Sequence, residues 1–178
     1  MIMPPSTRLK YRLMTLADGQ RLLDVDSDPM VMKFISNGVP TSEHDLDNIV
    51  LPRLAKYLQP NKGWGIWEVC DKVSNDYLGW ILVRPMHFFS THPEFDNWEL
   101  GWRFKQSTWG KGYATESAKH IMQTLSDKHK VYSFSAIAVA ENIASIHVMK
   151  KIGMSFEKSA FHVDPLINMQ MEYFRIEV

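Results

Sequence analysis

The chain has 178 residues, of which 45% are hydrophobic and 22% are charged, and its 20 basic and 20 acidic side chains cancel to a formal net charge of zero. This composition is typical of a globular protein and excludes extended disorder, and the lack of a basic excess argues against a nucleic-acid partner. The length favours one domain over residues 1–178; no secretory signal or membrane span is evident, so we expect a cytoplasmic protein.

The first half of the chain predicts a strand, three helices and a hairpin, in that order. The strand covers 7–13, where Arg8, Lys10 and Arg12 alternate with apolar side chains and are expected to form a solvated face. Proline lacks the backbone N–H that a helix interior needs, so the third helix should kink or restart at Pro52. The helices are expected at 15–25, 28–34 and 41–58, the hairpin strands at 64–70 and 77–84, and a loop at 85–95.

The second half of the chain alternates strands with helices. The strand at 131–139 is mostly apolar, which is typical of a strand covered on both faces, and Gly153 ends the last helix. Further strands are expected at 97–105, 155–162 and 168–176, and helices at 114–126 and 143–152. Together these elements predict an α/β (α+β mixed) architecture in which a mixed sheet is flanked by helices.

A glycine-rich turn joins the strand at 97–105 to the following helix. Gly110 and Gly112 allow the backbone to approach a ligand without Cβ atoms in the way, and the first N–H groups of the helix point at the same spot. A phosphate-rich ligand suits this arrangement, although an ordinary strand–helix turn has the same glycines. A Walker P-loop is excluded because Gly112 follows Lys111, and a Rossmann motif needs a third glycine. The residues expected to hold phosphates are Gly110, Lys111, Gly112, Tyr113, Ala114 and Thr115.

Segments spread over nearly the whole chain resemble the GNAT superfamily, specifically the branch that contains the N-terminal acetyltransferases of ribosomal proteins. They are Thr7-Arg8-Leu9 with Tyr11-Arg12-Leu13, Asp28-Pro29 with Val31-Met32, Trp98-Glu99-Leu100-Gly101-Trp102, the loop at 109–116, and Asn142-Ile143-Ala144-Ser145 with 150–154. Ser107 departs from the Gln or Arg that the wider superfamily prefers at its position. The resemblance implies a GNAT-like three-layer fold whose central mixed, splayed sheet has about six to seven strands.

The same resemblance implies acetyl-CoA as the cosubstrate, without a metal. Its pantetheine arm would lie along the end of the central strand, near Phe104, Lys105 and Gln106. Main-chain N–H groups there are the expected donors to the thioester oxyanion, because side-chain donors are scarce. Asn142 would hydrogen-bond the pantetheine arm, and it also suits the N-cap of the helix that it opens.

Glu99 is the expected general base. An alkylammonium is almost wholly charged at neutral pH, so a base or a water chain must remove a proton before the nitrogen can attack. On its strand Glu99 shares a face with Gly101, which should leave space beside it, and with Arg103. The alternative is a solvated Glu99 that only pairs with Arg103.

The reaction also needs an acid that protonates the departing thiolate. Several superfamily members use a tyrosine late in the Asn-containing helix, but Met149 stands at that position here. Ser145 is the expected substitute, and the alternative is a first-turn serine whose hydroxyl is satisfied by the backbone.

The expected function is therefore acetyl transfer from acetyl-CoA to a primary amine, on a protein N-terminus or a small molecule, by direct attack in a ternary complex. The alternative is a catalytically silent CoA-binding sensor or interaction module. Cys70, the only cysteine, is expected in the core, and His87 and His92 are expected to shape the acceptor pocket, since no third ligand is spaced for a metal site. We expect a monomer or a homodimer without nucleic-acid or membrane partners.

Overall fold

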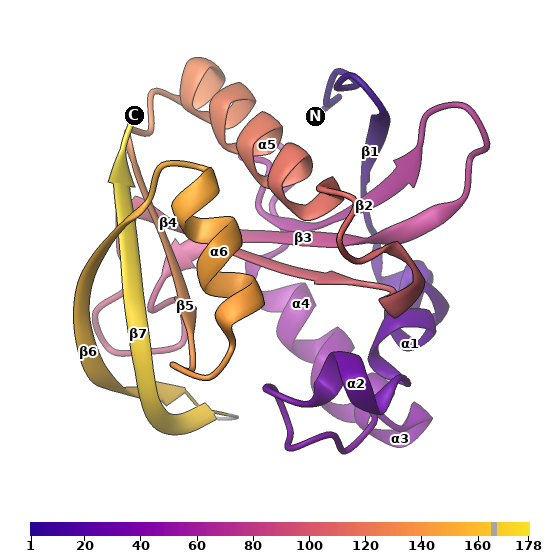
Figure 1. Cartoon of the computed structure of the whole chain (residues 1–178), viewed down its shortest axis with the longest axis horizontal. Coiled ribbons are helices and arrows are strands. Elements are labelled where there is room, and N and C mark those ends of the chain that lie inside the picture. Colours follow the sequence, from indigo (N-terminus) through magenta and orange to yellow (C-terminus); the bar gives the residue numbers. More distant parts are fainter. Residues whose placement is uncertain (165–166) are drawn as a thin grey trace.

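The computed structural model describes residues 1–164 and 167–178, which form a seven-stranded mixed sheet flanked by helices (Figure 1). The strand order is β1-β2-β3-β4-β5-β7-β6; β4 and β5 are parallel, and each other neighbouring pair is antiparallel. This confirms the predicted mixed α/β fold. The strands are β1 (Leu9–Leu13), β2 (Gly65–Asp71), β3 (Tyr77–Met86), β4 (Glu94–Phe104), β5 (Ser133–Ala138), β6 (Ser155–Asp164) and β7 (Ile167–Glu177).

The N-terminal helices begin one or two residues after their predicted starts. Thr15 and Asp18 form a capping box ahead of α1, and the side chains of Asp28 and Ser42 cap α2 and α3. The predicted disruption near Pro52 is a π-helical segment, η2, between α3 and α4. The helical segments are η1 (Leu16–Asp18), α1 (Gly19–Asp26), α2 (Pro29–Met32), α3 (Glu43–Asp45), η2 (Leu46–Val50), α4 (Leu51–Tyr57), η3 (Gln106–Thr108), α5 (Tyr113–His129) and α6 (Ile143–Lys151).

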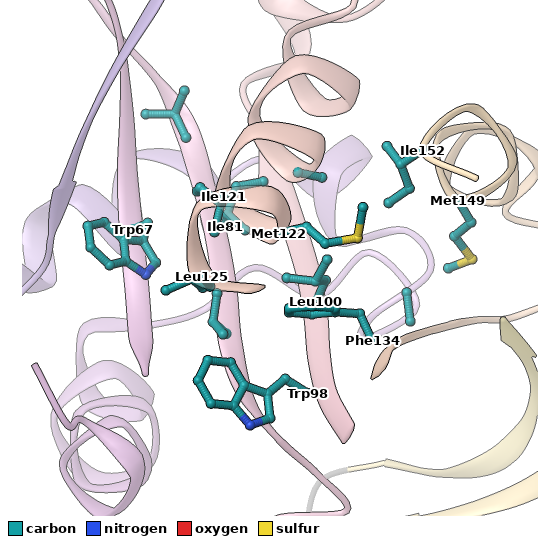
Figure 2. Packing of buried hydrophobic residues seen from close by; sticks show 14 of the residues in the cluster. Trp67, Ile81, Trp98, Leu100, Ile121, Met122, Leu125, Phe134, Met149 and Ile152 are labelled. Atoms are coloured by element: carbon teal, nitrogen blue, oxygen red, sulfur yellow. The ribbon is translucent and has the colours of Figure 1, made fainter. Parts of the chain in front are cut away.

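The larger part of the hydrophobic core lies between the sheet and the helices α5 and α6 (Figure 2). Ile121 and Leu125 of α5 and Met149 of α6 share this core with Trp98 of β4 and Phe134 of β5, and each of these side chains is at most 3% exposed. Each large apolar side chain buried in this way contributes about 1.5–3 kcal/mol. β5 is buried along nearly its whole length, which confirms the prediction of a strand covered on both faces.

The opposite face of the sheet is covered by α1 and α4. Leu22 of α1 and Leu54 of α4 pack in one cluster with Trp80 of β3. Successive side chains of a strand point to opposite faces. Because Trp98 faces α5, its neighbour Glu99 faces the side of α1 and α4. The fold thus gives β4 one apolar face and one face with charged groups.

Several strands are longer than their sequence patterns predict. The loop expected at 85–95 is shorter, because β3 extends through Met86 and β4 begins at Glu94, with a bulge between Pro85 and Met86. Proline is tolerated in a strand where the ladder is irregular. The last two strands, expected to be short, have 10 and 11 residues. β6 lies at the sheet edge with most side chains exposed, so hydrophobic alternation does not mark its ends.

Candidate active site

The two parallel strands at the centre of the sheet pair over a short stretch and then diverge. Their ladder consists of the pairs Asn97–Ser133, Trp98–Phe134 and Glu99–Ser135, with no further β4–β5 pairing among the described residues. β4 nevertheless continues to Phe104 and β5 to Ala138. The sheet is therefore splayed, as predicted, and the edge of β4 beyond Glu99 has no strand partner on its β5 side among the described residues.

The glycine-rich loop that follows β4 leads to an uncapped helix N-terminus. Gly110 and Gly112 have φ angles of 75° and 78°, in the left-handed region that favours glycine. A Cβ at Gly110 would meet no atom within 4 Å, and one at Gly112 would have Arg8 Nη2 as its nearest neighbour, at 3.6 Å. No side chain of the described residues caps α5, whose first N–H groups have no intrahelical partner. Open space, an uncapped helix and its dipole together fit a pyrophosphate.

Arg8 holds this loop against the start of the chain. Its Nε donates to Glu116 Oε2 at 2.7 Å and its Nη1 donates to the Lys111 carbonyl at 2.9 Å. Its guanidinium also lies 4.7 Å from the centre of the Tyr113 ring. The Arg8 side chain is 44% exposed, as expected for a solvated face, but it also makes these contacts with the loop. In the sequence, a role for Arg8 beyond solvation was indicated only by its place in the first segment that resembles the GNAT superfamily.

The end of β4 is tied into the protein through its backbone. The Lys105 N–H donates to the Leu78 carbonyl at 2.9 Å, and the Phe104 carbonyl accepts from the Trp109 indole N–H at 2.8 Å. The expectation that Lys105 contributes an oxyanion donor was wrong, because its N–H is already used by β3. The Phe104 side chain is buried, whereas Gln106 is exposed at the start of η3.

Asn142 lies at the start of α6, directly beyond β5. Its Oδ1 accepts from the Ser145 N–H at 3.2 Å, which confirms the N-cap role. Asn142 and Ser145 are both half-buried. Met149, one turn further along α6, is 1% exposed and belongs to the core, so this position supplies no acid.

Glu99 is buried and paired with Arg84 of β3. Arg84 Nε donates to Glu99 Oε2 at 2.7 Å, and the two side chains are 11% and 8% exposed. Burial alone would lower the pKa of Arg84, but the Glu99 carboxylate raises it above its usual value. The alternative of a solvated Glu99 that only pairs with Arg103 is wrong, because Glu99 is buried and Arg103 pairs with a carboxylate of α1. The space expected beside Glu99 is also taken, since a Cβ at Gly101 would lie 3.3 Å from Leu82.

The sequence also singled out Cys70, His87 and His92. Cys70 is buried in the core, as predicted, and burial raises the pKa of its thiol. His87 stacks on His162 and lies beside Tyr173, whereas His92 is exposed. In the part of the chain that the structure describes, no three His, Cys, Asp or Glu side chains are placed to hold a metal ion. No helix in that part is both long and apolar enough to cross a membrane.

The comparison with known families agrees with this geometry. The family model described as Acetyltransferase (GNAT) domain matches residues 8–155, from the start of β1 to the start of β6. The chain belongs to the GNAT acetyltransferase family. It is 31% identical over 152 residues to the uncharacterized N-acetyltransferase YnaD of Bacillus subtilis (strain 168), covering 84% of this chain and 81% of that protein.

Solved structures place this GNAT enzyme in the same fold. A GNAT-family acetyltransferase from Bacillus anthracis has a TM-score of 0.77 at 26% identity, covering 99% of this chain and 98% of that one. RimL, a ribosomal L7/L12 alpha-N-protein acetyltransferase in complex with coenzyme A, has a TM-score of 0.71 at 15% identity, covering 100% of this chain and 98% of that one. The second likeness shows the fold alone, so the ribosomal-protein branch stays a prediction. The GNAT chain is an acyltransferase of a family that uses acetyl-CoA.

Proposed function

We propose that this GNAT enzyme transfers the acetyl group of acetyl-CoA to a primary amine by direct attack in a ternary complex. The observation that carries the proposal is the divergence of β4 and β5 immediately before an uncapped helix N-terminus. A long ligand with phosphates at one end and a thioester at the other matches these two features in their order along the chain. The residues that we propose to bind it are Phe104, Lys105, Gln106, Gly110, Lys111, Gly112, Tyr113, Ala114, Thr115 and Asn142.

Glu99 and Ser145, the two proposed catalytic residues, lie on opposite sides of the splayed sheet. Glu99 faces the side covered by α1 and α4, whereas Ser145 lies on α6, which packs on the other side. We therefore propose that the amine approaches from the side of Glu99 and that the CoA sulfur leaves on the side of Ser145. Glu99 accepts a proton from the ammonium, directly or through water, and Ser145 is the proposed acid for the thiolate. Direct attack needs no covalent enzyme intermediate.

Release of free thiol from acetyl-CoA tests this function. The purified protein is incubated with acetyl-CoA and a panel of amines: peptides that begin with Ala or Ser, and the polyamine spermidine. Thiol release that depends on both the protein and an amine supports the proposal. Acetyl-CoA binding without amine-dependent release would identify the silent binding module instead, and the absence of binding would reject the cofactor site.

Asn142 offers a test of the pantetheine contact, because two substitutions separate its two roles. Asn142→Asp keeps an oxygen that accepts from the Ser145 N–H, so the helix cap and the melting temperature should be preserved. It removes the amide donor, and we expect the KM for acetyl-CoA to rise about fivefold, the equivalent of one hydrogen bond of about 1 kcal/mol. Asn142→Ala should show the same rise in KM and also lose about 0.5–2 kcal/mol of stability. An unchanged KM in both variants would leave Asn142 as a cap alone.

Four further properties stay predictions. The acceptor is a protein N-terminus or a small molecule, and the zero net charge gives no electrostatic preference between them. We also predict a single domain over residues 1–178, a monomer or homodimer, and a cytoplasmic location.

A further inference from the structure

Tyr173 and His162 form a buried hydrogen-bonded pair on the same face of the sheet as Glu99. The Tyr173 hydroxyl lies 2.8 Å from His162 Nδ1, and the two residues are 4% and 3% exposed. Glu99 pairs with Ser135 of β5, and Tyr173 of β7 pairs with Ile137, two residues further along β5. Paired residues, and residues two apart on one strand, share a face. The pair therefore lies on the side from which we propose that the amine approaches.

Charged and titratable groups from several elements surround this pair. The ring of His87, in the loop after β3, lies 5.7 Å from the His162 ring and 5.9 Å from the Tyr173 ring. Lys158 Nζ lies 5.2 Å from the centre of the Tyr173 ring. The other charged groups that act on the pair are Glu99 and Glu94 of β4, Arg84 of β3, and Asp164 and Glu157 of β6.

The surroundings hold both groups in their neutral forms at neutral pH. Burial lowers the pKa of His162 below its usual value, although the negative charge of Glu99 acts in the opposite direction. Burial raises the pKa of Tyr173, and Glu99 raises it further. A neutral imidazole can accept the proton of a phenol while the phenol oxygen accepts another proton. The pair can therefore pass a proton from a third group to His162.

The proposed reaction leaves one proton of the amine without an assigned acceptor. An alkylammonium must lose two protons from its nitrogen to become an amide. The first leaves before attack, because the nitrogen needs its lone pair, and under the proposed function it goes to Glu99. The second leaves as the C–N bond forms. One of the two protons finally resides on the CoA sulfur and the other in solvent.

We propose that Tyr173, backed by His162, accepts the second proton of the amine; this inference rests on the proposed function. As the nitrogen bonds to the acetyl carbon, its N–H bond breaks and the proton passes to the Tyr173 oxygen, while the Tyr173 O–H proton passes to His162 Nδ1. The electron pair of the C–S bond leaves with the sulfur, which takes a proton from Ser145 or water on the other face, and Ser145 regains a proton from solvent. His162 then returns its proton through Tyr173, which releases it to solvent, and Glu99 also releases its proton to solvent, so that one proton is released per turnover.

The substitution Tyr173→Phe tests the relay, because it removes the hydroxyl and keeps the ring that packs against Met86 and Met171. We expect kcat to fall about 10²-fold, the lower end of the range for a general base, with the KM for acetyl-CoA unchanged. The loss should persist at high pH, since the second proton is bound to the amine at any pH. Tyr132→Phe is the matched control, because this tyrosine is 54% exposed and lies before β5.

His162→Asn separates proton transfer from positioning. The asparagine amide can accept a hydrogen bond from the Tyr173 hydroxyl, but it cannot take up a proton as imidazole does. If His162 serves as the terminal proton acceptor, His162→Asn should lower kcat about 10²-fold and remove the fall in kcat that we expect of the wild type as the imidazole becomes protonated in acid. Retained activity with an unchanged pH profile would reduce His162 to a structural partner.

Two results would overturn the relay without touching the proposed function. The first is a wild-type enzyme that acetylates an amine of the panel while Tyr173→Phe does so at the same rate. The second needs no acceptor: NMR titration of the histidine side chains, with His162→Asn to assign the signal, must show a neutral His162 at pH ~7. A protonated imidazole there would exclude it as a proton acceptor. Wild-type protein that releases no thiol with any amine would instead reject the proposed function.

Discussion

Glu99→Gln is expected to lower kcat by about 10²–10⁴-fold at neutral pH, the range for a general base. The affinity for acetyl-CoA should not change, because Glu99 faces the side of the sheet opposite α5 and α6. The loss should shrink at high pH, where more of the amine arrives without its extra proton. Steady-state kinetics across pH, with the best acceptor of the panel, measures this effect. It also separates Glu99 from Tyr173, because the loss in Tyr173→Phe should persist at high pH.

The ion pair of Glu99 with Arg84 makes a stability control necessary. Removing one partner of a buried ion pair lowers the free energy of unfolding by about 3–5 kcal/mol. Glutamine removes the negative charge but keeps a hydrogen-bond acceptor. Glu68→Gln is the matched control, because Glu68 is also buried and pairs with Arg12 and Arg21 on β1 and α1, away from the gap between β4 and β5. It should lose stability and keep kcat. A rise in the acceptor's KM at constant kcat would make Glu99 a binding group, and an unaltered kcat and KM would remove it from the mechanism.

Gly112→Val is expected to abolish the thermal stabilisation of the protein by acetyl-CoA. A ligand at about 100 times its Kd stabilises the folded state by about 2.7 kcal/mol, which corresponds to about 5–10 °C for a chain of this size. Valine at Gly112 would fill the space over the uncapped start of α5 and would strain a backbone with φ of 78°. Differential scanning fluorimetry with and without acetyl-CoA provides the measurement.

Gly38→Val controls for backbone strain in this experiment. Gly38 has a φ of 81° in the loop after α2 and lies outside the proposed site. This variant should melt at a lower temperature than the wild type and still respond to acetyl-CoA. A full response in Gly112→Val would place the phosphates elsewhere.

The sequence predicted the features that depend on local chain geometry. The glycine-rich turn at 110–112, the helix starts near 28 and 41 and the interruption near Pro52 are set by residues within one turn of each other, and the structure contains each of them. The partner of Glu99 was not predicted correctly. On a strand, residues 99 and 103 are about 13 Å apart, whereas cross-strand partners lie about 5 Å apart, so Arg84 on the neighbouring strand was the closer cation.

The rest of the candidate site depends on contacts between distant segments. Arg8 reaches Glu116 across 108 positions, and the pair of Tyr173 and His162 forms through the register of a hairpin whose ends the sequence did not mark. No periodic pattern in one sequence records such a register. These residues became candidates when the sheet order placed β7 beside β5 and thereby close to Glu99.

The short parallel contact between β4 and β5 also has a mechanical consequence. It divides the sheet into a block of four strands and a block of three, joined by three residue pairs where longer ladders hold the other strands together. Shear between the two blocks therefore meets less resistance from backbone hydrogen bonds than shear within either block. A pantetheine arm bound between β4 and β5 would contact both blocks and would restrain their movement relative to each other. Binding of the cosubstrate would then also make the whole sheet more rigid, before the acceptor binds.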